Sequence, residues 1–289
     1  MLEWRAQSLH LGVSRDAASL VLREHPSQKS HKSQKLQTWR VLGSSSLAAF
    51  SGEAYVPALR DAVHDLLSQH AARRATLDIV FDDRLARLWM TTPPAGATRP
   101  SDIEGAAMLR FANLFGETPE HWQIAGDWQV THPFCTAALP RALVDTLVVT
   151  AQACRVPVTS IAPQFVRAWN RWQRQCRTPG WFAVMHDDLM RIGIANGSDA
   201  HHRLHAIHEV TMPSDRDIYW LAQTLARTAM LMGVAPATTL HLCGTVRNDA
   251  RVTLAALHVN TLASAAVHET SDGHDWQATD VLATGGALV

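Results

Sequence analysis

The clearest pattern in the sequence is GWFAVMHDDLMRIGIANG, residues 180–197. Its two apolar runs, residues 181–186 and 190–195, predict two strands of a hairpin running towards the turn Asn196-Gly197. The paired acids Asp187 and Asp188 lie on a turn between these runs, where Asp is favoured for conformational reasons. The alternating residues 204–210 predict a third strand, and a capped helix and a further strand are predicted to follow it. The second half of the chain therefore starts with three strands and a helix.

The first half shows the same order of elements. Residues 8–13, 19–23 and 37–42 predict three strands, and Pro57 opens a helix. Strands are then predicted at residues 77–81 and 84–89, on either side of an acidic turn. Because two halves repeat one α/β order, the pattern predicts an α/β protein with two lobes.

An amphipathic helix is predicted after the proline-rich segment near residue 95. Ser101 and Glu104 have the spacing of a capping box, in which two side chains satisfy the first free backbone amides of a helix. Gly116 suits the end of this helix, because glycine adopts the left-handed backbone at little cost.

Composition excludes several classes of function. The chain has 289 residues, with 26 Lys and Arg balanced by 26 Asp and Glu, so no net charge holds it on nucleic acid or on an anionic membrane. No run reaches the roughly 18 apolar residues of a membrane span. The four cysteines show no CxxC spacing, which argues against zinc and thiol-redox chemistry. We therefore expect a cytoplasmic protein without a nucleic-acid partner.

Several stretches, in this order and spacing, resemble the PilM and GspL family of bacterial pilus and type II secretion machines. They are residues 180–197, quoted above, together with LDIVFDDRLARLWMTTP (77–93), SDIEGAAMLRFANLFGETPEHWQI (101–124), SIAPQFVRAWNRW (160–172) and the closing TGGALV (284–289). The resemblance implies an actin-like fold of the ribonuclease H-like (ASKHA) type. It assigns residues 1–175 to a first lobe, with a small inserted subdomain at about 77–135. Residues 176–272 form the second lobe, and residues 273–289 return to the first.

Departures from the nucleotide-binding members of this superfamily bear on function. Those members hold phosphate and metal with two hairpins that carry an Asp next to a Gly. In this sequence Gly12 is present but His10 stands at the Asp position, and Val184 and His186 stand at the Asp and Gly positions of the second hairpin. A third motif, a Gly-Gly pair, is reduced to one residue, Gly244. The resemblance therefore implies degenerate nucleotide motifs, no cofactor and no catalysis.

The alternative is an active nucleotide-binding ATPase or kinase of the actin superfamily. It requires nearby acids to replace the missing ones, Asp16 in the first hairpin and Asp187 or Asp188 in the second. The histidine cluster of residues 201, 202, 205 and 208 is a further candidate for a metal site. On a strand these side chains divide between two faces, so we expect no metal there.

The resemblance implies a non-catalytic cytoplasmic scaffold, peripheral to the inner membrane through a partner. The expected partner is the cytoplasmic segment of a PilN-like or GspM-like membrane protein. The assembly ATPase and a second copy of the chain are further candidate partners. Such a segment would lie along a groove or a sheet edge of the first lobe, where main-chain hydrogen bonds give affinity. Arg87 and Trp89, on the strand predicted at 84–89, are the candidate partner-binding residues, although Trp89 could equally belong to the core.

Overall fold

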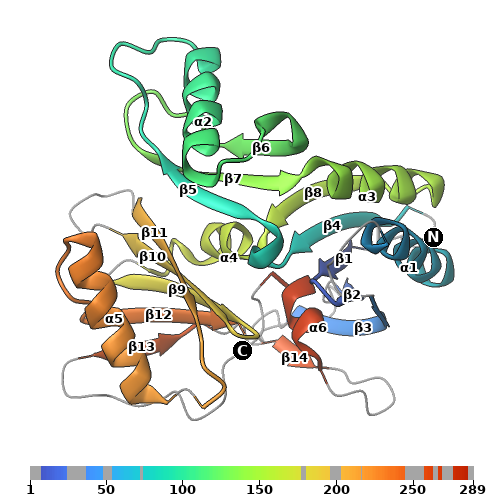
Figure 1. Cartoon of the computed structure of the whole chain (residues 1–289). Coiled ribbons are helices and arrows are strands. Elements are labelled where there is room, and N and C mark those ends of the chain that lie inside the picture. The colour runs from blue at the N-terminus through green and yellow to red at the C-terminus, as the bar shows by residue number, and fades with distance from the viewer. Residues whose placement is uncertain are drawn as a thin grey trace, which may run out of the picture. The chain divides into compact units, whose positions relative to one another are not determined.

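A computed structural model describes residues 8–24, 37–47, 54–71, 74–176, 180–195, 203–215, 217–244, 257–262, 266–268 and 276–285 (Figure 1). The chain divides into two compact units. The first comprises Met1–Leu85, Ala142–Arg167 and Ala263–Val289, and the second comprises Ala86–Arg141 and Ala168–Leu262. This division places the inserted segment in the same unit as the second half of the chain, where β5 and β7 contact β11. The lobe boundaries implied by the resemblance stay a prediction.

The first unit is built on a six-stranded sheet of order β14-β3-β2-β1-β4-β8. Its strands are β1 (Ser8–Val13), β2 (Ala17–Glu24), β3 (Gln37–Ser46), β4 (Thr76–Phe81), β8 (Val158–Pro163) and β14 (Ala266–His268). Its helices are α1 (Tyr55–His70), α3 (Arg141–Ala153) and α6 (Ala278–Ala283), with the short η1 (Asp83–Leu85) and the first half of α4 (Gln164–Trp172). The first three strands are antiparallel neighbours, whereas β4 runs parallel to β1 and β8 runs parallel to β4.

The second unit contains a five-stranded sheet of order β11-β10-β9-β12-β13. Its elements are β9 (Trp181–His186), β10 (Leu189–Ala195), β11 (Leu204–Thr211), α5 (Ile218–Met232), β12 (Thr239–Gly244) and β13 (His258–Thr261). As in the first unit, three antiparallel strands precede a helix, and two parallel strands then extend the sheet from its first strand. The repeated element order predicted from the sequence is therefore confirmed.

The inserted segment of the second unit forms a small sheet of order β5-β7-β6. Its elements are β5 (Arg87–Thr91), α2 (Pro100–Phe115), η2 (Pro119–His121), β6 (Trp122–Gly126) and β7 (Phe134–Pro140). Trp89, Ala107, Phe111 and Ala138 form its buried core. No helix among the residues given above is long and apolar enough to cross a membrane.

Several local predictions were wrong or shifted. The strand predicted at 84–89 begins at Arg87, because Asp83–Leu85 form a 3-10 turn. The capping box at Ser101 is not formed, because α2 already begins at Pro100 and its N-cap, Arg99, makes no side-chain cap. The turn between β9 and β10 is Asp187-Asp188, as predicted, and the turn predicted at Asn196-Gly197 lies outside the described residues. By contrast, Gly116 ends α2 in the left-handed conformation, as predicted.

Both faces of the first sheet are covered by helices. The side chain of Leu66 on α1 lies against Gly43 of β3, whose cross-strand partner is Leu20. On the opposite face, the backbone of α6 lies directly on β1: a Cβ atom at Gly12 would be 2.5 Å from the carbonyl oxygen of Thr279. This contact requires glycine because the neighbouring atoms are backbone and cannot move aside easily.

We predict that Gly12→Ala lowers the free energy of unfolding by about 1–3 kcal/mol or more, because the added methyl group overpacks the contact with α6. Thermal or denaturant unfolding of the whole chain measures this loss. The matched control is Gly105→Ala in α2, where a Cβ atom meets nothing within 4 Å. The control should gain roughly 0.5–1 kcal/mol, because alanine is favoured in a helix. Equal behaviour of the two variants would contradict the close packing of α6 on β1.

Candidate functional site

The turn of the first hairpin uses its own backbone amides. The amide of Ser14 donates to the carbonyl of Ala17 (2.9 Å), and the amide of Ala17 donates to the Ser14 hydroxyl (3.1 Å). The same hydroxyl donates to the Asp16 carboxylate at 2.7 Å, and Tyr55 donates to the Ser14 carbonyl oxygen at 2.6 Å. A phosphate-binding hairpin instead needs free amides that point at the ligand. This turn is closed on itself and offers fewer of them.

Two positions of the predicted phosphate loop serve packing in the first unit. His10 is 2% exposed, and its Nε2 lies 3.1 Å from the Ser8 hydroxyl. Its ring stands edge-on to Trp39, with centroids 4.8 Å apart. Gly12 is the residue on which α6 rests. Both positions are thus built into the sheet and the helix that covers it.

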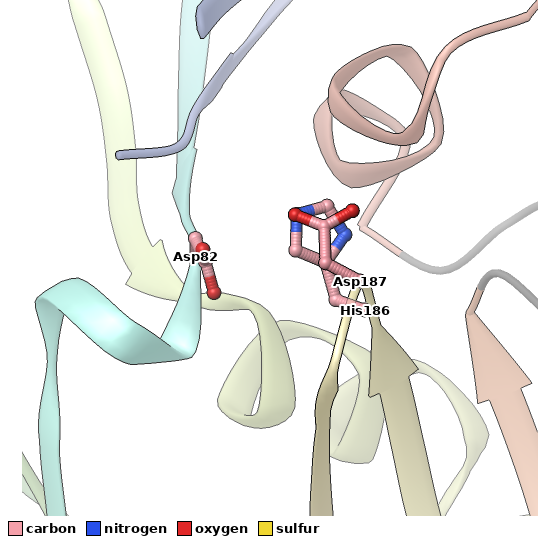
Figure 2. A group of neighbouring side chains, drawn as sticks. All are labelled: Asp82, His186 and Asp187. Atoms are coloured by element: carbon pink, nitrogen blue, oxygen red, sulfur yellow. The ribbon is translucent and has the colours of Figure 1, made fainter. Parts of the chain in front are cut away.

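The second hairpin places its predicted positions inside β9. Val184 and His186 are each 2% exposed. Figure 2 shows His186 and Asp187 where β9 turns into β10, and separately shows Asp82 directly after β4. Asp187 adopts a positive φ of 51° and is 42% exposed, as expected for a tight two-residue turn. Sequence reasoning correctly assigned these two acids to a turn.

Gly244, the remaining residue of the predicted adenosine motif, ends β12 with a φ of 105°. A Cβ atom there would collide with the carbonyl oxygen of Met185 on the neighbouring strand. Only glycine fits this close approach of two backbones. The close approach of the two backbones therefore explains the glycine at this position, and no nucleotide is needed to explain it.

The acids that follow β4 are buried. Asp83 accepts a hydrogen bond from the backbone amide of Phe165 at 3.1 Å and so caps the start of α4. Asp82 accepts from the amide of Arg84 at 3.0 Å, inside η1. Burial, followed by the charges of Asp82 and Asp16, raises the pKa of Tyr55, which keeps this phenol protonated as a donor.

Within the described residues, neither unit alone brings together three side chains able to hold a metal ion. Of the histidine cluster, residues 201 and 202 lie outside the described part.

A groove lies along the outer edge of β8 in the first unit. In the described sheet β8 is the last strand, so one side of its backbone has no strand neighbour. The groove has a volume of about 510 Å³. Its lining comes from α3, from β8 and from the residue just before β8: Val148, Gln152, Pro157, Val158, Thr159, Ser160 and Ile161. Val149, next to it on α3, is an apolar side chain that is 63% exposed. An open strand edge beside an apolar helix face is the geometry that captures extended peptides.

The sequence alone did not indicate this groove. Its residues are ordinary apolar and hydroxyl side chains, and only the sheet order reveals that β8 lies at an edge. The exposed apolar Val149, on a helix whose other apolar residues are mostly buried, is the one signal that could have marked it.

The Asp78 carboxylate on β4 binds side chains of β8 that line this groove. Its Oδ1 accepts from the hydroxyls of Thr159 (2.6 Å) and Ser160 (2.7 Å), and its Oδ2 accepts from Arg167 (2.8 Å). The Nδ1 atom of His10 lies 3.7 Å from the same Oδ2. Burial alone would raise the pKa of Asp78, but the two hydroxyl donors, then Arg167 and His10, outweigh it and lower the pKa below its usual value.

The residues predicted to bind a partner lie on β5 of the inserted segment. Trp89 is 4% exposed and packs against Phe111 and Phe115. Arg87 is about one-third exposed, forms an ion pair with Glu117 at 3.0 Å and stacks over the ring of Trp122. Both side chains thus contribute to the packing of the small sheet, and their role towards a partner stays a prediction.

Three solved structures are similar to this chain over nearly their whole length. The PilM–PilN type IV pilus biogenesis complex has a TM-score of 0.62 and 13% identity, covering 98% of each chain. A Bacteroides thetaiotaomicron protein of actin-like ATPase fold and unknown function has a TM-score of 0.57 and 12% identity, covering 90% of this chain and 94% of that one. The cytoplasmic domain of EpsL, an inner membrane component of the type II secretion system of Vibrio cholerae, has a TM-score of 0.52 and 12% identity, covering 97% and 94%.

No family model and no curated protein matches the sequence. At identities of 12–13% these likenesses establish the fold. The chain has an actin-like fold, as predicted, and its structural neighbours include a PilM protein and a GspL-type protein.

We predict that Trp89→Ala lowers the free energy of unfolding by about 3–5 kcal/mol, as for other buried tryptophans. Arg87→Ala should cost at most about 1 kcal/mol, because its ion pair is partly exposed. Unfolding curves of both variants measure the difference. A Trp89→Ala variant as stable as the wild type would contradict the burial of this ring in the core.

Proposed function

We propose that the chain is a non-catalytic scaffold of a type IV pilus or type II secretion-like inner-membrane platform. In this proposal it is cytoplasmic and sits at the membrane through a partner, whose cytoplasmic segment it binds. The observation that carries the proposal is the groove at the free edge of β8, because an open strand edge recognises an extended chain by its main-chain groups. The actin-like neighbours, one of them a PilM in complex with PilN, support this kind of partner.

The proposed absence of catalysis rests on the two hairpins. The first hairpin bonds its own amides, and His10, where an acid would stand, is buried against Trp39. In the second, the buried Val184 and His186 occupy the corresponding positions within a strand. An acid that orients metal-bound water is thus replaced in both places.

We propose that the partner segment adds to β8 as an extended strand, with its side chains resting on Val148 and Gln152 of α3. This places the docking surface in the first lobe, as the sequence-based hypothesis did, but on β8. The inserted segment with Arg87 stays a second candidate surface. The assembly ATPase and a second copy of the chain also stay candidate partners.

We predict that isothermal titration with ATP and magnesium gives no binding in the micromolar range and that the chain hydrolyses no ATP. The reason is that the amides of Ser14 and Ala17 are bonded within the turn of the first hairpin, which leaves fewer amides for a phosphate. Magnesium-dependent binding that disappears in Asp16→Ala or Asp187→Ala would instead support the alternative, an active nucleotide-binding enzyme.

We predict that the chain carrying a photo-crosslinking amino acid at position Gln152 becomes cross-linked to one inner-membrane protein. The experiment is done in the cells that naturally produce the chain. Gln152 is exposed and lines the groove, so mass spectrometry should map the cross-link to a cytoplasmic segment of that protein. The matched control places the same amino acid at Gln223, an exposed position on α5. Identical products at both positions, or only soluble proteins at Gln152, would refute the docking surface.

A further inference from the structure

The edge strand β8 carries a bulge where it meets β4. Leu77 pairs with Val158 and Asp78 pairs with Ser160, so Thr159 is an extra residue between the two pairs. A bulge of this kind redirects side chains and increases the local twist of a strand. Here it lets two consecutive residues, Thr159 and Ser160, turn their hydroxyls to one carboxylate, that of Asp78.

The same two residues line the groove proposed to bind the partner. Val158 and Ile161 on either side complete the wall that β8 contributes. The carboxylate of Asp78 therefore holds the bulged part of the strand from the side opposite to the free edge. A strand edge binds an extended segment only when its amide and carbonyl groups keep the spacing of a ladder.

Arg167 reinforces this attachment. Its two terminal nitrogens bond Asp78 at 2.8 Å and the Ser160 hydroxyl at 3.2 Å. Gly285, just after α6, lies against Arg167 so closely that a Cβ atom there would be 2.5 Å from the Cγ atom of the arginine. The side chain of Arg167 is thus held in place from α6, and the network joins one charge of each sign with two hydroxyls.

We infer that Asp78 is a positioning residue for partner binding: it sets the backbone geometry of β8 at the bulge and thereby the affinity of the groove for an extended segment, without touching that segment. This inference rests on the proposed docking function.

The probe is a set of twelve-residue peptides selected from a random phage-displayed library on the wild-type chain. Only peptides whose binding is blocked by Gln152→Trp, which fills the groove, are kept. Dissociation constants are then measured by fluorescence anisotropy for Asp78→Ala, Asp78→Asn, Thr159→Val and the double variant Asp78→Ala with Thr159→Val. The control variant is Asp102→Ala, an exposed acid of α2.

We expect Asp78→Ala to weaken peptide binding by about tenfold, a factor within the range of coupling between residues of one network. Asp78→Asn should retain more of the affinity, because its amide oxygen still accepts from both hydroxyls. In the double variant the combined loss should be smaller than the sum of the two single losses, because both single variants remove the contact between Thr159 and Asp78. Asp102→Ala should bind as the wild type does. Thr159→Val keeps every charge, so it tests the inference even if Asp78→Ala fails to fold.

Two results would overturn the inference in distinguishable ways. If peptides bind the groove and neither Asp78→Ala nor Thr159→Val changes their affinity, Asp78 has no positioning role while the docking function stands. Additive losses, or equal losses in Asp78→Asn and Asp78→Ala, would equally reject it. If selection yields no peptide that Gln152→Trp blocks, the docking surface itself is wrong, and the inference falls with it.

Discussion

The hydrogen bonds between the Asp78 carboxylate and the hydroxyls of β8 are the interaction on which the free edge of the first sheet depends. The carboxylate lies on β4 beside His10 of β1, binds two hydroxyls of β8 and pairs with Arg167 of α4. A half-buried carboxylate is stable only when donors surround it, and here those donors come from separate segments of the chain. Removing the carboxylate would leave Arg167 without this partner and would remove the bonds that the hydroxyls of Thr159 and Ser160 make to β4.

The chain has an actin-like fold, and the positions at which the sequence suggested degenerate nucleotide motifs have packing roles in it. The backbone of α6 packs against Gly12, the backbone of β9 packs against Gly244, and His10 packs on Trp39. Each of these residues has a packing explanation that stands without a ligand. That is the physical basis for proposing a binding protein in place of an enzyme.

The order of elements could be predicted from the sequence because apolar periodicity and turn residues mark it directly. The repeated three strands and helix, and the glycine at the end of α2, are local signals. The start of β5 and the cap of α2 were mispredicted because a 3-10 turn and Pro100 decided them, and both depend on neighbouring contacts. The edge position of β8 and the bulge at Thr159 follow from strand pairing, which single-sequence periodicity does not encode.

Amide hydrogen exchange of the chain, free and bound to its partner segment, shows whether the partner lies on the edge of β8. We expect binding to slow exchange at the amides of β8, residues 158–162, and to leave the hairpin turn at residues 14–17 unchanged. The opposite pattern, slower exchange at the hairpin turn with β8 unaffected, would contradict it and point to a ligand held by the hairpin.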